Sequence, residues 1–264
     1  MRESLQTWLG VVRSLRIYYG DRPRRDGMDA MHARFLKTGD LAFDVGSHVG
    51  DRVASFRRLG ARAVALEPQP ALARTLSLLF ALDRGVVIER KAVGSHEGEI
   101  EIKLNLRNPT VATASREFIE AADGAPGWEG QAWTRSLKVP LTTLDALIAR
   151  HGEPAFVKID VEGLEDEVIA GLTRPLKALS LEFTTIQRDV GLRAIERLAR
   201  LGPYRFNAAL GESQQLAHRE PLDAGAISQW IAELPITANS GDVYAALDST
   251  SLRSTGERNA ARAA

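Results

Sequence analysis

The chain alternates between short apolar runs and longer segments whose apolar residues recur every three or four positions. The short runs predict buried strands at 41–45, 63–66, 86–89, 155–159, 178–183 and 204–208. The longer segments predict helices at 49–59, 70–82, 142–152, 165–170, 190–201 and 224–234. Strands that alternate with helices form a mostly parallel sheet with helices on both faces, so the predicted fold class is α/β. A last strand at 241–246 is expected to form an antiparallel edge with 204–208.

The two ends of the chain depart from this alternation. Residues 1–39 predict an N-terminal extension of two helices, with a charged, turn-rich break at 20–27 and the second helix at 28–36. Residues 248–264 are polar and rich in Ala and Arg, which predicts a flexible tail. The main domain is therefore expected to span residues 40–247.

A third departure lies inside the main domain, at 105–138, after an alternating strand at 99–104. Irregular segments of this length are uncommon unless they are functional loops or disordered, and Trp128 and Trp133 argue against disorder. We interpret 105–138 either as a lid or substrate-side insertion, or as a surface loop whose tryptophans are fixed to the core.

Composition narrows the function classes. The 264 residues suit one α/β domain with additions, or two small domains. The 34 basic and 34 acidic residues balance, which argues against a general nucleic-acid binder. The absence of cysteine excludes disulfides, cysteine–zinc sites and thiol nucleophiles. No apolar window is long enough for a transmembrane helix. We expect a cytoplasmic protein, and the oligomeric state stays open, a homodimer included.

The N-terminal apolar residues predict a docking helix. Arg13 and Arg16 interrupt the apolar run and no small-residue cleavage site follows, which argues against a signal peptide. Contact with a membrane surface is the second interpretation, and the neutral net charge makes it the weaker one.

Residues 41–70 form one strand–turn–helix–strand unit of the size found in nucleotide-binding folds. A dinucleotide site requires G-x-G-x-x-G, but here His48 stands near the position of the middle glycine, between Gly46 and Gly50. This spacing weakens an NAD or FAD interpretation. S-adenosylmethionine has no pyrophosphate and does not need such a close approach to the backbone, so it fits the turn better.

Two carboxylates of this unit are candidate cofactor ligands. Asp44 ends the first strand, where it could meet the ammonium group of S-adenosylmethionine. Glu67 ends the second strand, 21 residues after Gly46, where a carboxylate can accept hydrogen bonds from both ribose hydroxyls. Each carboxylate alone has an ordinary structural interpretation, a turn cap or a surface residue, but their spacing on one unit favours the cofactor. We include Ser47 and Gly50 of the same turn among the predicted cofactor-binding residues.

A second group of candidate residues follows a later strand. Lys158, Asp160 and Glu162 alternate with apolar residues in KIDVEG, an unusual pattern for a strand that is covered on both faces. They are expected at the carboxyl end of the strand, where open α/β sheets bind ligands. A Lys–Asp ion pair that holds the loop is the alternative interpretation. Glu182, on the next strand, could join this group.

Together, DVGSHVGDR, ALEPQP and FVKIDVEGLEDEVIAGL resemble the FkbM family of S-adenosylmethionine-dependent methyltransferases. The likeness runs from about residue 41 to about residue 246 and includes NPTVATAS, SLEF and GDVYA. It implies a class I methyltransferase fold with a Rossmann-like sheet, S-adenosyl-L-methionine as cofactor, and O-methylation of a small-molecule, sugar or lipid-type hydroxyl. It also implies cofactor-binding roles for Asp44, Gly46 and Glu67, and places Asp160 beside both cofactor and acceptor.

Methyl transfer to oxygen mainly needs a positioned acceptor and a base that removes its proton. Asp160, His48 and Glu162 are the candidate bases, in that order. Asp160, Glu162 and Glu182 could instead hold a divalent cation, but Lys158 beside them supplies competing positive charge, so we expect no metal.

The acceptor pocket is expected to include Trp128 and Trp133 and the loops after Asp160 and Phe183. Two alternatives from other classes remain: an NAD-dependent oxidoreductase, and a non-catalytic Rossmann-like binding protein.

Overall fold

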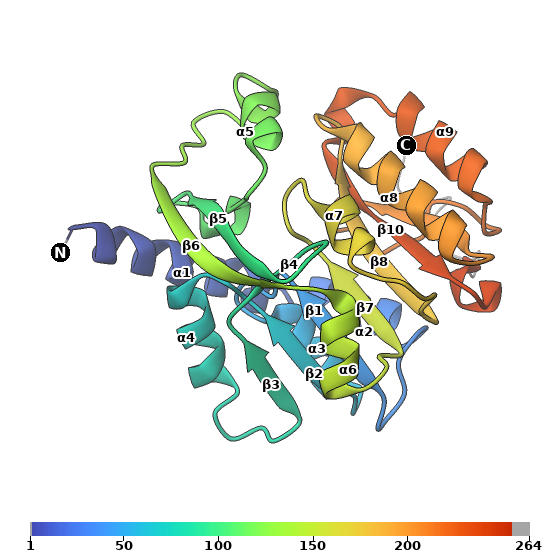
Figure 1. Cartoon of the computed structure of the whole chain (residues 1–264), viewed down its shortest axis with the longest axis horizontal. Coiled ribbons are helices and arrows are strands. Elements are labelled where there is room, and N and C mark those ends of the chain that lie inside the picture. Colours follow the sequence, from blue (N-terminus) through green and yellow to red (C-terminus); the bar gives the residue numbers. More distant parts are fainter. Residues whose placement is uncertain (1, 255–264) are drawn as a thin grey trace.

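The computed structural model describes residues 2–254, with side chains from residue 6 onward, and is built around a seven-stranded sheet (Figure 1). Its strands are β1 (Leu41–Val45), β2 (Arg62–Leu66), β3 (Val86–Glu89), β7 (Phe156–Ile159), β8 (Ala178–Thr184), β9 (Arg205–Leu210) and β10 (Ser240–Ala246). Their order is β3-β2-β1-β7-β8-β10-β9. All pairs are parallel except those of β10, which runs antiparallel to both β8 and β9. The predicted α/β class is confirmed, and so is the antiparallel pairing at one edge of the sheet. β10 lies between β8 and β9, so β9 is the outermost strand.

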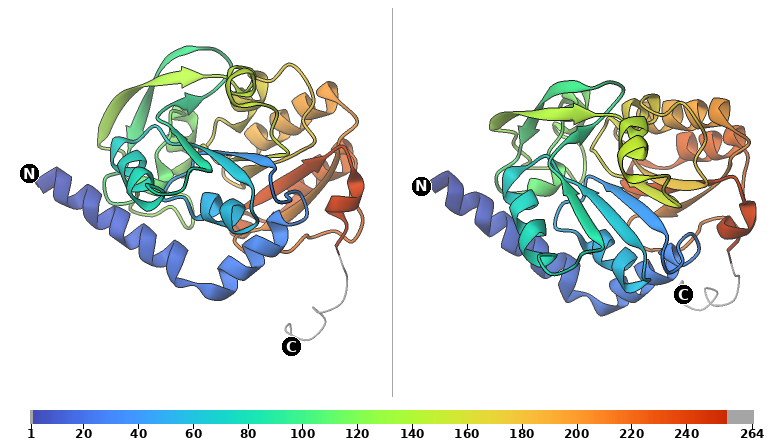
Figure 2. Two further views of the ribbon diagram at one scale, coloured as in Figure 1. Left: turned by 90° about the horizontal axis from the view of Figure 1, so that it is seen from below. Right: turned by 60° about the horizontal axis from the view of Figure 1, so that its bottom comes forward.

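Helices cover both faces of this sheet (Figures 1 and 2). One face packs against α2 (Arg22–His32), α3 (Asp51–Arg58) and α4 (Pro70–Leu79). The other packs against α6 (Leu144–His151), α7 (Glu165–Ala170), α8 (Arg188–Leu201) and α9 (Ala224–Glu233). The N-terminal helix α1 (Arg2–Gly20) contacts α4 and the short 3-10 helix Pro109–Val111. None of the described helices is both long and apolar enough to cross a bilayer.

Side chains of β1 show how the sheet separates two cores. Leu41, Phe43 and Val45 belong to the core under α6–α9, and Ala42 belongs to the core under α2–α4. Because strand side chains alternate between faces, Asp44 lies on the α2–α4 face with Ala42. Lys158 is the register partner of Asp44 on β7, so its side chain is on this same face.

A second, three-stranded sheet stands over the carboxyl ends of the main strands. It consists of β4 (Ala92–Val93), β6 (Arg135–Thr142) and β5 (Gly98–Leu104), in that order. The sequence analysis predicted neither β4 nor β6, and the first half of β6 falls in the segment 105–138 that was expected to be irregular. Pro140 within β6 lacks an N–H donor and weakens the strand signal.

The two tryptophans of the 105–138 segment are fixed to a small core of their own. Trp128 and Trp133 contact Phe118 of α5 (Arg116–Ala122) edge to face, with ring centroids 5.1 and 6.4 Å apart. The indole N–H of Trp133 donates to the carbonyl of Val111 at 2.7 Å, and that of Trp128 to Asn239 Oδ1 at 3.2 Å. These contacts agree with the second interpretation of the segment, in which the tryptophans are anchored.

The N-terminal break was predicted in the wrong place. The charged residues 22–27 are helical, because Asp21 accepts a hydrogen bond from the backbone N–H of Arg24 at 3.0 Å and Pro23 occupies the first turn. The helix ends at His32, earlier than expected. Met31 and Leu36 join the core of Val53 and Phe56, so the predicted boundary at residue 40 does not separate two cores.

The predicted flexible tail was wrong for its first residues. Ser249–Leu252 forms a 3-10 helix, and the Leu252 side chain is fully buried. The carbonyl oxygen of Leu252 accepts a hydrogen bond from Asn207 Nδ2 at 2.8 Å. Residues 255–264 lie outside the described part of the chain.

Leu252→Ala is expected to lower the free energy of unfolding by about 2–5 kcal/mol, because it leaves a cavity in the core. Leu82→Ala is the matched control, since the Leu82 side chain is almost fully exposed. Chemical denaturation of both variants measures the difference. Equal stability of the two would contradict the placement of Leu252 in the core.

Candidate active site

An open cavity with about 130 Å³ of space accessible to water lies at the carboxyl ends of β1, β2, β7 and β8. The second sheet closes one side of it through Val93, Ile100 and Ile102, and the segment 109–114 closes another. Tyr18 of α1 and Glu212, from the loop after β9, also line it. The carboxyl ends of the strands, where this cavity lies, are the place at which α/β sheets bind ligands.

The turn at 46–50, called here the glycine turn, is held tightly between β1 and β7. Gly46 has a φ of 85°, and a Cβ added there would lie 1.8 Å from the carbonyl oxygen of Asp160. Only glycine fits this approach, and Gly46 itself lines the cavity. Ser47 Oγ donates to the carbonyl of Asp44 at 2.7 Å, and Gly50 packs against Leu76. Ser47 and Gly50 therefore shape the turn, and neither is on the cavity wall.

Glu67 lies on the cavity wall and links the glycine turn to the end of β2. Its two carboxylate oxygens accept hydrogen bonds from the backbone N–H groups of His48 at 2.9 Å and Gln69 at 2.8 Å. Each oxygen keeps a second lone pair for a ligand. Burial raises the pKa of Glu67 to about 8, although the two N–H donors oppose this.

Asp44 is fully buried behind the glycine turn and is not a wall residue. Neither of its carboxylate oxygens has a hydrogen-bond partner within the described residues. Burial raises its pKa to about 7, against the opposing effect of Arg52. Direct contact between Asp44 and a ligand would need the turn to open, so its predicted ammonium contact would have to run through water.

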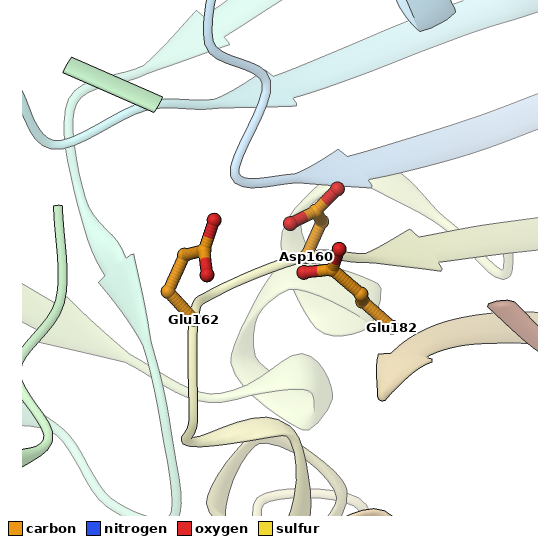
Figure 3. Close-up of side chains that lie close together, drawn as sticks. All are labelled: Asp160, Glu162 and Glu182. Carbon is orange, nitrogen blue, oxygen red and sulfur yellow. The ribbon is translucent and has the colours of Figure 1, made fainter. Parts of the chain in front are cut away.

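Asp160, Glu162 and Glu182, called here the carboxylate cluster, gather on the cavity wall (Figure 3). One oxygen from each lies within 4.8 Å of the others. Glu162 has a φ of 57°, in the left-handed region, so the loop after β7 turns sharply there. Thr113 Oγ1 donates to the Glu162 carbonyl at 2.5 Å and holds this turn. Oε2 of Glu162 and Oε2 of Glu182 have no hydrogen-bond partner among the described residues.

Two buried cations neighbour the cluster. Lys158 Nζ lies 2.8 Å from Asp242 Oδ1 and 3.4 Å from Asp160 Oδ2. Arg52 reaches Asp160 at 3.7 Å and Glu212 at 3.6 Å. Burial alone would raise the pKa of Asp160, but Lys158 and Arg52 lower it to about 2. The Lys–Asp ion pair that the sequence suggested is present, and its shorter contact is to Asp242.

The other two carboxyls of the cluster behave differently. Burial raises the pKa of Glu162 well above its usual range, and Asp160 and Glu165 raise it further. Burial also raises the pKa of Glu182, with Asp160 and Glu162 adding to the effect. The pKa values of these two carboxyls are thus shifted upward, whereas that of Asp160 is shifted downward.

His48 lies on the cavity wall beside the glycine turn, with a left-handed φ of 48°. Its Nε2 is 3.4 Å from Thr110 Oγ1, and its ring contacts Tyr18 edge to face at 5.3 Å. Burial lowers its pKa to about 4, so the imidazole is neutral at physiological pH. The structure thus brings His48 and Glu67 together on one wall of the cavity and the cluster on another.

The sequence analysis missed several wall residues. Tyr18 and Glu212 carried no motif, Arg52 ends the DVGSHVGDR motif but was not singled out, and only the NPTVATAS stretch pointed toward Thr110 and its neighbours. Trp128 and Trp133 were expected to line the acceptor pocket, but they pack with Phe118 and are absent from the wall of this cavity.

A Rossmann-like sheet with a glycine turn after β1, a carboxylate at the end of β2 and acidic residues after β7 defines a class I methyltransferase. The family model for the methyltransferase FkbM domain matches residues 44–206, which include the glycine turn and the carboxylate cluster. The chain therefore belongs to the FkbM methyltransferase family and is an S-adenosylmethionine-dependent methyltransferase. A comparison with curated proteins found no match.

Solved structures with a similar fold are distant. Precorrin-6Y C5,15-methyltransferase from Geobacter metallireducens is 15% identical with a TM-score of 0.45, over 83% of this chain and 87% of that chain. An O-methyltransferase from Bacillus cereus in complex with SAH is 9% identical with a TM-score of 0.43, over 90% of each chain. A TehB-like SAM-dependent methyltransferase from Corynebacterium glutamicum is 9% identical with a TM-score of 0.42, over 83% of this chain and 86% of that chain. Likeness at this level carries no information about the acceptor.

The protein without ligands is expected to lose stability as the pH rises from about 6.5 to about 8. In this window the folded Glu67 carboxyl stays protonated, with its pKa at about 8, while the unfolded chain is ionised. Unfolding then releases a proton, and rising pH favours it. The raised pKa values of Asp44, Glu162 and Glu182 act in the same direction, whereas His32 and His48, with pKa values of about 3 and 4, oppose it below about pH 6.5 because they stay neutral only in the folded chain.

Thermal unfolding midpoints at constant ionic strength test this pH dependence. Glu67→Gln should have a lower midpoint, because its amide nitrogen cannot accept a backbone N–H, and a flatter slope above pH 6.5. A wild-type midpoint that rises between pH 6.5 and 8 would contradict the expected protonation of Glu67.

Proposed function

We propose that the protein transfers the methyl group of S-adenosylmethionine to a hydroxyl oxygen of a small-molecule, sugar or lipid-type acceptor. The observation that carries this proposal is the arrangement of the cavity. The glycine turn and Glu67 form one wall, and the carboxylate cluster forms another. A cofactor held on the first wall would present its methyl group to an acceptor held against the second.

The residues of the first wall fit the cofactor. Glu67 keeps lone pairs toward the cavity, where two ribose hydroxyls could donate to it. Gly46 lines the cavity, and its missing side chain lets the turn pack against the carbonyl oxygen of Asp160. When bound, S-adenosylmethionine supplies a methyl group on a sulfonium, which is already activated for displacement. The protein's tasks are then to orient the acceptor and to remove its proton.

His48 is the base that we propose for this proton. Of the three predicted candidates, Asp160 is held in ion pairs with a pKa of about 2, which makes it a poor proton acceptor. The pKa of Glu162 is raised by burial and by its acidic neighbours, so this carboxyl is harder to ionise than an ordinary glutamate. His48 is neutral and lines the cavity, so its Nε2 can take the acceptor's proton. Asp160 is instead proposed to orient the acceptor as a fixed negative charge.

The two alternative functions, an NAD-dependent oxidoreductase and a non-catalytic binding protein, have less support than methyl transfer. Membership of the methyltransferase family removes the reason to consider an NAD-dependent oxidoreductase. A non-catalytic binding protein would share the fold, but the neutral His48 and the buried carboxylates around the cavity would then have no chemical task.

Screening with methyl-labelled S-adenosylmethionine and extracts fractionated by acceptor class tests the proposal. The expected product carries the label as a methyl ether, which survives mild base. Label on nitrogen or carbon would overturn O-methylation, and binding of the cofactor without any transfer would favour the non-catalytic alternative.

Glu67→Ala is expected to weaken binding of S-adenosylhomocysteine by about 1–3 kcal/mol, because hydrogen bonds between the Glu67 carboxyl and the ribose are lost. Calorimetry with a 2′,3′-dideoxy analogue separates this loss from a change in the turn. The wild type should discriminate strongly between the two ligands, and the variant should not. Glu99→Ala, on an exposed residue, is the control. Equal discrimination by Glu67→Ala and the wild type would remove Glu67 from the ribose site.

His48→Asn is expected to lower kcat by about 10²-fold or more while cofactor affinity stays close to that of the wild type. Asparagine tolerates the left-handed backbone at this position but is not a base. Single-turnover rates with the acceptor from the screen measure the effect. A rate within a factor of two of the wild type would show that another group removes the proton.

A further inference from the structure

We propose that the carboxylate cluster binds one hard divalent cation, of the Mg²⁺ or Mn²⁺ type, at the acceptor side of the cavity. The sequence analysis weighed such a site and expected no metal, because Lys158 supplies competing charge. The positions of the side chains alter that balance.

The first reason is the geometry of the three oxygens. Asp160 and Glu162 come from the loop after β7, Glu182 comes from β8, and one oxygen of each lies within 4.8 Å of the others. Oxygen ligands bind Mg²⁺ and Ca²⁺ at about 2.0–2.6 Å, so two ligands of one ion are at most about 5 Å apart. The three carboxylates can therefore reach one ion without rearrangement of the backbone.

The second reason is that two of these oxygens lack partners. Glu162 is only 7% exposed, and its Oε2 has no hydrogen bond within the described part of the chain. Figure 3 shows its carboxyl turned toward the space that it shares with Asp160 and Glu182. Glu182 Oε2 is likewise without a partner. Buried polar atoms are nearly always paired, so these two oxygens indicate a missing ligand.

The third reason is the charge around the cluster. Lys158 is closer to Asp242, at 2.8 Å, than to Asp160, at 3.4 Å. Arg52 is shared between Asp51, Asp160 and Glu212. Among the described residues no salt bridge reaches Glu162 or Glu182, although Lys158 lies near enough to lower the pKa of both. Asp160 and Glu182 also share a hydrogen bond. Ionising all three carboxyls this close together is costly unless a cation is shared between them.

The type of ion follows from the donors. All three are carboxylate oxygens, with no sulfur or imidazole in the cluster, which favours hard cations over zinc or copper. The cluster opens onto the cavity, so further coordination positions are accessible to water or to acceptor oxygens. On the basis of the proposed methyl transfer, an acceptor with two neighbouring oxygens, such as a vicinal diol, would bind the ion through both.

Titration of the full-length, EDTA-treated protein with Mn²⁺, followed by calorimetry and by electron paramagnetic resonance, tests the site without cofactor or acceptor. We expect one Mn²⁺ per chain, displaced by Mg²⁺. Glu162→Gln and Glu182→Gln should each weaken binding at least tenfold, because each removes an anionic ligand. Glu99→Gln, an exposed carboxylate on β5, should leave Mn²⁺ binding unchanged.

Absence of binding at millimolar Mn²⁺, Mg²⁺ and Ca²⁺ would overturn the proposal, as would equal binding by both cluster variants and the wild type. Thermal unfolding of the variants shows that they are folded. Binding of S-adenosylhomocysteine in EDTA is measured in parallel and separates the two proposals. Loss of cofactor binding alone would count against the methyl-transfer site, and loss of Mn²⁺ binding alone would count against the cation site.

Discussion

The site depends on the ion pairs that the buried ammonium group of Lys158 forms with Asp160 and Asp242. Lys158 sits in the middle of the sheet, 1% exposed, and contacts carboxylates from its own loop and from β10. A buried charge is tolerated only when it is paired and hydrogen-bonded. The carboxylate partners of Lys158 must therefore be in place before neighbouring elements can bury β7. The contact with Lys158 lowers the pKa of Asp160 and keeps this carboxylate charged. The acceptor side of the cavity therefore carries a negative charge. Glu162 and Glu182 then face a fixed negative neighbour, which is why their protons are hard to remove.

Much of the fold could be predicted because its strands are buried on both faces and its helices carry one apolar side. The pattern was weaker where these conditions fail. β6 has a wet face and contains Pro140, so its residues resemble a loop. The first turns of α2 are almost entirely charged, and only the cap at Asp21 and the proline at 23 mark a helix start. Leu252 is one apolar residue in a polar segment, and no periodicity signals its burial.

The sequence could predict which acidic residues come together at the site, but it could not predict which of them can act as a base. Asp160, Glu162 and Glu182 could be grouped because alternation along β7 and parallel pairing put them at one sheet edge. Their order as bases could not be found, because it depends on ion pairs with Arg52 and Lys158 and on burial. Glu212 comes from a loop that carries no motif. It meets the site only because β9 is folded back beside β10, a relation that no local pattern contains.

The position of β10 has a consequence for the order in which the protein can be made. β10 is the last strand of the sheet in the chain, yet it lies between β8 and β9. During synthesis, both of those strands leave the ribosome with an open edge that only the final residues can fill. Asp242, the closest partner of Lys158, arrives with the same strand, 84 residues after it. A nascent or prematurely terminated chain therefore exposes two strand edges and an uncompensated charge together, which marks incomplete molecules for chaperones and proteases.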